Sequence, residues 1–188
     1  MIERLKQLFH IEDTKGRLVL AGVLLVVGVF LTIAFISFFS SWENDQSVLR
    51  DTTAEISAID PSITELPPSE IQNRAGKIGA IVSKKFIHDW FGIGSFAIVF
   101  LCFYCMLRAL NFFKETSVYR YLCIAISLMI VSSITFGFFF NDVWDGNIGG
   151  CLGYYLSYQL LPNLLGKFVT GLLIVAFDII YVFCTFNS

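Results

Sequence analysis

The stretch LVLAGVLLVVGVFLTIAFISFFS, residues 18–40, contains 23 consecutive residues without a charged side chain. At a rise of about 1.5 Å per residue, a helix of this length crosses a hydrocarbon core of about 30 Å. Sixteen of its residues are Leu, Ile, Val or Phe. At roughly −0.3 to −0.6 kcal/mol each, they make insertion favourable by roughly 5 to 10 kcal/mol. The stretch therefore predicts a transmembrane helix, and it is longer than the apolar region of a cleaved signal peptide.

Three further apolar runs have a similar length, at residues 90–107, 121–140 and 168–186. The whole chain is 56% hydrophobic and 15% charged, which leaves too few polar residues to cover a soluble domain. The predicted fold class is an all-α integral membrane protein, in which residues 1–188 form a single membrane domain. Its four transmembrane helices are expected at about residues 18–40, 88–110, 120–140 and 166–186.

The distribution of lysine and arginine predicts the orientation in the membrane. Residues 1–17 and 108–120 contain seven basic residues in 30 positions, whereas residues 41–89 and 141–167 contain six in 76. Cytoplasmic segments carry the excess of positive charge in membrane proteins. We therefore expect both termini and the short middle link to lie in the cytoplasm.

The long extracytoplasmic loop, residues 41–87, is predicted to contain an amphipathic helix. Pro67 and Pro68 stop any preceding helix, and Ser69 followed by Gln72 is a capping-box pattern. Apolar residues then recur every three or four positions, at Ile71, Ala75, Ile78, Val82 and Phe86. Such a helix would lie on the outer membrane surface before the chain turns at His88 and Asp89 into the second span.

The segment 146–166 lacks charged residues, but it is rich in Gly, Asn and Pro. These residues make a poor lipid-facing helix, so we expect a short interfacial or re-entrant helix here. A fifth crossing is the alternative. It would place the C-terminus outside and contradict the charge distribution.

Asp178 is the acidic residue predicted to lie within a span. Insertion of an Asp at the centre of a helix costs roughly 2.5 to 3.5 kcal/mol, which the apolar residues around it outweigh. A proton or ion relay is one interpretation. The favoured one is an interhelical hydrogen bond, because a lone acid makes a poor relay and buried polar groups in bundles find partners. The candidate partners are Ser127, Ser132, Ser133, Thr135 and Tyr104.

Glycines provide the other candidate site, either for packing within one subunit or for an oligomer interface where backbones approach closely. The candidate packing or interface residues, together with Asp178, are Gly76, Gly79, Gly92, Gly149, Gly150 and Gly153. Gly94 belongs to the same pattern. No catalytic, cofactor-binding or metal-ligating residue is predicted, since His10 and His88 have no ligand spacing around them.

Several of these residues, in their order relative to the four spans, resemble the N-terminal four-span domain of the FtsK/SpoIIIE family of bacterial DNA translocases. The resemblance covers residues 15–186. It rests on Ser41-Trp42 with Asp45-Gln46-Ser47, on Asn73, Gly76 and Gly79-Ala80, on Phe91-Gly92, and on Gly149-Gly150, Gly153 and Gly166.

The resemblance implies a membrane anchor that acts in cell division and chromosome segregation. Family members are held at the division septum of the bacterial inner membrane, where a cytoplasmic hexameric ATPase moves DNA. The implied partners are the lipid bilayer, division-site membrane proteins and further copies of the chain. No G-x-x-x-x-G-K-[ST] motif occurs in the sequence, so ATP and Mg²⁺ are expected only for a motor domain beyond Ser188. No direct contact with nucleic acid is expected, because acids alternate with the basic residues near the N-terminus.

Two alternatives belong to other functional classes. Cys102 and Cys105 have the spacing of a redox pair, and a DsbB-like thiol oxidoreductase also has four spans. However, Cys102 lies about 18 Å along the helix from Trp90, deep in the bilayer, whereas a redox pair needs an exposed thiolate. We therefore expect no enzymatic activity. A small transporter or channel subunit is the second alternative, but the spans lack a stripe of polar residues to line a pore.

Overall fold

The computed structural model describes residues 14–57, 71–112, 118–143 and 148–186, with the backbone alone for 49–57. Every regular element in these ranges is a helix, which confirms the all-α fold class. The long helices are α2 (Thr14–Ser57), α4 (Phe96–Ala109), α5 (Val118–Phe139) and α8 (Lys167–Phe186). The short ones are α3 (Gly76–Ser83), η1 (Lys84–Phe91), η2 (Gly92–Ser95), α6 (Gly150–Gly153), η4 (Tyr154–Leu160) and α7 (Leu161–Leu165).

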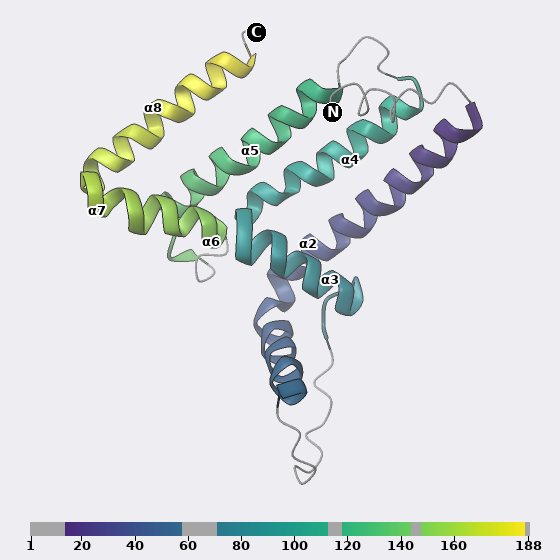
Figure 1. The fold of residues 1–188 in the computed structure, drawn as a ribbon, viewed down its shortest axis with the longest axis horizontal. Coiled ribbons are helices and arrows are strands. Elements are labelled where there is room, and N and C mark those ends of the chain that lie inside the picture. Colours follow the sequence, from purple (N-terminus) through teal and green to yellow (C-terminus); the bar gives the residue numbers. More distant parts are fainter. Residues whose placement is uncertain (1–13, 58–70, 113–117, 144–147, 187–188) are drawn as a thin grey trace.

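Four helical segments are long and apolar enough to cross a membrane. They are Thr14–Val48, Gly76–Ala109, Val118–Phe139 and Lys167–Thr185. Figure 1 shows α2, α4, α5 and α8 in a row, with α4 and α5 between the other two. The start of α2 and the end of α8 lie on the same side of these four helices, and the short helices lie on the opposite side. This arrangement agrees with an even number of crossings.

Helix α2 is longer than the sequence predicted. We expected a loop from residue 41, but the helix continues to Ser57 and spans about 66 Å at 1.5 Å per residue. The reason is that no Gly or Pro occurs between Gly28 and Pro61 to end the helix. The polar residues after Ser40 mark where the helix leaves the apolar run, not where it stops.

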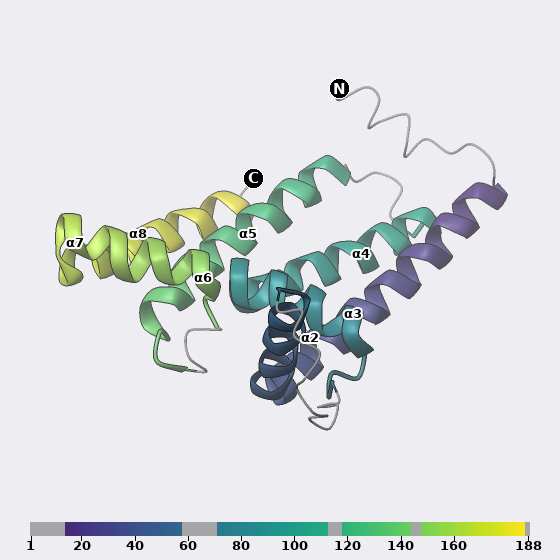
Figure 2. The ribbon, with the colours of Figure 1, turned by 60° about the horizontal axis from the view of Figure 1, so that its bottom comes forward.

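The helix α2 changes direction about midway, as Figures 1 and 2 show. The Ser40 hydroxyl donates to the Ser37 carbonyl at 2.9 Å, and the Ser41 hydroxyl lies 3.0 Å from the same oxygen. Serine hydroxyls that bond back to the preceding turn compete with the backbone hydrogen bonds and bend helices. The serines at positions 37–41 therefore favour a bend in this part of α2.

The predicted amphipathic helix also differs in its bounds. Residues 71–73 are not helical, α3 begins at Gly76, and Ala75 makes no side-chain capping hydrogen bond; Ser69, half of the expected capping box, lies outside the described residues. The chain turns into the second span at Gly92, not at His88 and Asp89. Gly92 has a φ of 60°, a backbone conformation that glycine adopts without strain.

The segment between the third and fourth spans is a short helical rod, as expected. Helices α6, η4 and α7 follow one another from Gly150 to Leu165, and they lie across the end of the row in Figure 1. Gly166, with a φ of 82°, then reverses the chain into α8. This segment is not among the four candidate crossings in the described ranges.

The densest packing lies between α2, α4 and η1. Phe35 and Ile87 are completely buried, and the Phe35 ring meets Phe96 edge to face at 5.5 Å between centroids. Inside a membrane such side chains hold helices together by close van der Waals packing, because lipid tails are as apolar as the side chains themselves. This core fixes the first two spans against each other. By contrast, α8 exposes many large apolar side chains, as a lipid-facing helix does.

Candidate functional site: a glycine junction and a polar clasp

Six glycines meet where α5, α6 and the η1–η2 turn come together at the end of the row. We call this set the glycine junction; its members are Gly92, Gly94, Gly137, Gly149, Gly150 and Gly153. All six are buried. They join the second half of the chain to the first through contacts between backbones.

One side of the glycine junction joins the η1–η2 turn to α6. A Cβ atom on Gly92 would lie 1.9 Å from the Ile148 carbonyl oxygen, and one on Gly150 would lie 2.5 Å from the Trp90 carbonyl oxygen. The Ile93 amide donates to the Ile148 oxygen at 2.8 Å. No side chain fits between these backbones, and both glycines also have a positive φ that other residues rarely adopt.

The other side joins α5 to α6. A Cβ on Gly153 would lie 2.0 Å from the Ser133 carbonyl oxygen, and one on Gly137 would lie 2.4 Å from the Gly153 carbonyl carbon. The buried Ser133 hydroxyl donates to the Gly149 carbonyl oxygen at 2.6 Å. Small residues at such contacts let helices approach closely inside a membrane, and the serine hydrogen bond adds to the association.

The structure divides the predicted glycines into three groups. Gly92, Gly94, Gly149, Gly150 and Gly153 come together in the junction. Gly79 is buried separately, and its Cβ would lie 2.8 Å from the Asn73 Oδ1. Gly76 does not pack: it is exposed and has nothing within 4 Å, and its φ of 70° identifies it as the turn that starts α3.

A second site holds residues 71–75 against α2. We call it the polar clasp; its members are Ser37, Ser41, Asp45, Gln72 and Asn73. Asp45 is 4% exposed. Its Oδ1 accepts from the Gln72 amide at 2.7 Å, and its Oδ2 accepts from the Ser41 hydroxyl at 2.6 Å. Hydrogen bonds to an ionised group are stronger than those between neutral groups.

Asn73 occupies the centre of the polar clasp and is 3% exposed. Its Nδ2 donates to the Ala34 carbonyl oxygen at 3.1 Å, and its Oδ1 accepts from the Ala75 amide at 2.9 Å. The Ser37 Oγ accepts from the Arg74 amide at 3.0 Å. The bonds to the Arg74 and Ala75 amides satisfy backbone donors that lie just before the start of α3.

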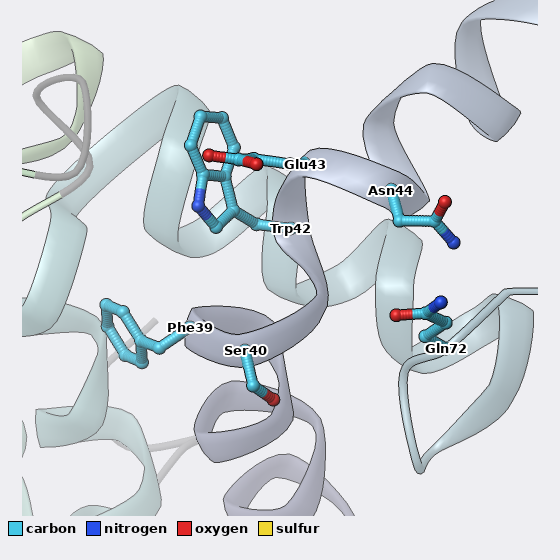
Figure 3. A pocket seen from close by; sticks show the side chains of 6 residues that line it. All are labelled: Phe39, Ser40, Trp42, Glu43, Asn44 and Gln72. Carbon is cyan, nitrogen blue, oxygen red and sulfur yellow. The ribbon is translucent and has the colours of Figure 1, made fainter.

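A pocket of about 620 Å³ lies beside the polar clasp, lined by Phe39, Ser40, Trp42, Glu43, Asn44 and Gln72. Figure 3 shows the side-chain amides of Asn44 and Gln72 facing each other, while Trp42 and Glu43 lie close together at another side of the helix. The lining combines aromatic rings with amides and one carboxylate, all at the place where α2 leaves its apolar run.

Asp178 forms the interhelical hydrogen bond that the sequence favoured. The Thr135 hydroxyl lies 3.0 Å from Oδ1 and 2.9 Å from Oδ2 of Asp178, and it also lies 2.9 Å from the Val131 carbonyl oxygen. One hydroxyl thus links α5 to α8. The neighbouring Ser127 hydroxyl contacts the Tyr181 hydroxyl at 2.9 Å, so two polar contacts join these helices.

The two cysteines with redox spacing lie within the span α4. Cys102 packs against the core formed by α2 and α4, at a distance of 3.5 Å from where a Gly28 Cβ would lie. Both thiols are half-buried and free. Among the described residues, no three His, Cys, Asp or Glu side chains are grouped to hold a metal ion.

Sequence reasoning missed Gly137, and it named Asp45 for the family resemblance without predicting its contacts. Gly137 is an isolated glycine inside an apolar run, and such a glycine costs about 1 kcal/mol in a helix relative to alanine, which marks it as a packing position. Asp45 follows Ser41 and Ser37 at four-residue steps, so the three share one helix face. That pattern is visible only if the helix is continued past Ser40.

Comparison with curated proteins gives no match, and comparison with solved structures gives none either. A family model does match residues 16–187, and it describes the 4TM region of the DNA translocase FtsK/SpoIIIE. The match covers all four candidate spans and both the glycine junction and the polar clasp. The chain therefore belongs to the family of the four-transmembrane region of the FtsK/SpoIIIE DNA translocases.

Proposed function

We propose that this chain is the membrane anchor of a septal DNA translocase that acts in cell division and chromosome segregation. Its contribution is localisation at the division septum and contact with division-site membrane proteins. The match to the FtsK/SpoIIIE membrane region across residues 16–187 carries the proposal. In support, the clusters of buried polar residues and glycines that we found bind one part of the chain to another.

The proposal assigns no chemistry to this chain. ATP and Mg²⁺ belong to a motor domain outside it, and DNA is bound there and not by residues 1–188. Full-length subunits assemble as a hexamer. Cys102 and Cys105 serve packing, so replacing both by alanine should leave membrane insertion and septal targeting intact. Loss of disulfide formation in exported proteins after this change would favour a thiol oxidoreductase instead.

The proposed orientation places both termini and the link between α4 and α5 in the cytoplasm of a bacterial inner membrane. Seven basic residues in 30 positions on that side, against six in 76 on the other, support it. Reporter fusions after Asn111 and Ser188 should show cytoplasmic activity, and a fusion after Glu55 should show activity outside. An external signal at Ser188 would contradict the orientation.

The test of the anchor function is the position of a fluorescent fusion of residues 1–188 in dividing cells. We expect enrichment at midcell without a motor domain. Replacement of Gly149, Gly150 and Gly153 by leucine should remove the enrichment by disrupting the glycine junction. Gly22→Leu is the matched control, because Gly22 has nothing within 4 Å. Protein levels must be compared, since the triple variant can fail to fold.

A uniform membrane distribution of the wild-type fusion, in cells with normal septa, would overturn the proposal that this chain carries its own address. It would leave a passive tether. A fusion that reaches midcell equally well in the triple glycine variant would separate septal targeting from the fold of the junction.

A further inference from the structure

An apolar groove runs between α4 and α5, which lie side by side in both ribbon views. Its volume is about 220 Å³. The lining is almost entirely aliphatic and aromatic, from Ala97, Phe100, Leu101, Tyr104, Tyr121, Ile124, Ala125 and Leu128. Phe100 is 71% exposed. Because both helices are candidate membrane spans, the groove opens toward lipid.

Two tyrosines mark one end of the groove. The rings of Tyr104 and Tyr121 stack at 4.1 Å between centroids. Tyrosine favours the membrane interface, where its ring contacts acyl chains and its hydroxyl reaches water. The tyrosine pair lies where α4 approaches its end and α5 begins, so this end of the groove lies near headgroup depth.

Two arginines continue the faces that line the groove. Arg108 lies four residues after Tyr104 on α4, and Arg120 lies four residues before Ile124 on α5. Residues four apart lie on the same face of a helix. The two arginines therefore make the end of the groove marked by the tyrosines positively charged.

We propose that this groove binds an anionic phospholipid, with one acyl chain between α4 and α5 and the phosphate at Arg108 and Arg120. The positive charge of the arginines favours an anionic headgroup rather than a neutral one, because basic pockets between transmembrane helices bind acidic headgroups. Both arginines also interact with other groups of the chain. A guanidinium has five N–H donors, so it can bind a phosphate in addition. The proposal goes beyond anchoring and does not depend on septal localisation.

Lipid-dependent thermal stability of the purified chain in neutral detergent tests the proposal. A ligand that binds the folded state raises the unfolding midpoint, and a ligand of higher affinity does so at lower concentration. Dioleoylphosphatidylglycerol should raise the midpoint at lower concentration than dioleoylphosphatidylcholine. Glycerol 3-phosphate should produce no rise, because it lacks the acyl chains. Equal responses to the two lipids would overturn the proposed headgroup, and a response to glycerol 3-phosphate alone would identify a phosphate site without a lipid.

Variants separate the headgroup from the acyl chain. Arg108→Gln and Arg120→Gln should each weaken the apparent affinity about fivefold, as expected for about 1 kcal/mol per basic residue. Lys77→Gln, an exposed basic residue on α3, is the control and should have no effect. Ala125→Phe should fill the groove and abolish the selectivity, whereas Val182→Phe on the exposed face of α8 should not. A wild-type response of a folded Ala125→Phe variant would overturn the proposal.

Photochemical labelling tests the site even if the groove-filling variant does not fold. A phosphatidylglycerol with a diazirine in its acyl chain, in vesicles of phosphatidylcholine, should label the α4 and α5 residues of the groove more than α8. Helix α8 is the internal reference, since its exposed apolar side chains contact bulk lipid. Equal labelling of α8 and the groove would overturn the proposal. So would crosslinking of the groove to a second copy of the chain.

Discussion

The glycine junction and the polar clasp each join one part of the chain to another, but they do so by opposite means. The junction joins the second half of the chain to the first by removing side chains, so that backbones meet directly. The clasp joins residues 71–75 to α2 by adding polar side chains, which satisfy backbone groups at distances of 2.7 to 3.1 Å. Added side-chain volume should therefore destabilise the junction, and loss of a hydrogen-bonding group should destabilise the clasp.

The largest expected effect is the loss of the folded state in Gly153→Leu. Overpacking costs about 1 to 3 kcal/mol where side chains can move, and here the obstacle is the Ser133 backbone at 2.0 Å from the new Cβ. We expect at least about 3 kcal/mol of destabilisation, seen as loss of the monodisperse peak in detergent. Gly22→Leu should remain monodisperse. A stable Gly153→Leu variant would show that the junction tolerates volume and would end the contrast with the clasp.

The next effect concerns hydrogen-bonding groups in the clasp. Asp45→Ala leaves the Gln72 amide without its acceptor, which costs about 1 to 3 kcal/mol for a buried group, whereas the Ser41 hydroxyl can still donate to the Ser37 carbonyl 3.0 Å away. We expect a lower thermal midpoint and faster hydrogen exchange at the Gln72 amide. Asp45→Asn, which keeps one acceptor, should be intermediate. Glu43→Ala, at an exposed neighbour, should have no effect on that exchange. Unchanged exchange in Asp45→Ala would mean that the clasp does not hold residues 71–75.

The sequence predicts the glycine junction much better than it predicts the polar clasp. Five of the six junction glycines were predicted as packing residues, because glycine in an apolar setting marks close approach. The polar clasp was not predicted, since its acid and serines share a helix face only when α2 continues to Ser57. Polarity indicates where a helix leaves lipid but not where it ends. The partners within each site depend on which helices lie side by side, and no local pattern encodes that.

A smaller effect is expected for the contact between α5 and α8. Thr135→Val removes the hydroxyl that reaches Asp178, and side-chain hydrogen bonds between membrane helices contribute about 0.6 kcal/mol on average and at most about 1.7. Asp178→Asn keeps an acceptor and should be nearly neutral. Equilibrium unfolding in mixed micelles measures both. A loss above about 3 kcal/mol in Asp178→Asn would show that this residue does more than a neutral polar contact.

The smallest effect is expected at the surface of η1. Lys85 lies 3.3 Å from Asp89 and 5.4 Å from the centre of the Trp90 ring, but its side chain is 54% exposed. Exposed ion pairs between residues four apart on a helix contribute about 0.3 to 0.5 kcal/mol and weaken with salt. Lys85→Ala should therefore lower the free energy of unfolding by no more than about 0.5 kcal/mol. A salt-independent loss as large as that of Asp45→Ala would show that charge at this surface has a structural role.

The continuous helix from Thr14 to Ser57 also has a mechanical meaning. A flexible loop after the first span would absorb any force applied beyond the bilayer, whereas a helix transmits it along its length. The bend lies near the serines at 37–41, and the Asp45 contact to the Gln72 amide fastens the helix just past this bend to the residues that precede α3. A force applied at the Ser57 end of α2 would therefore reach residues 71–75 through this contact as well as the first span through the helix.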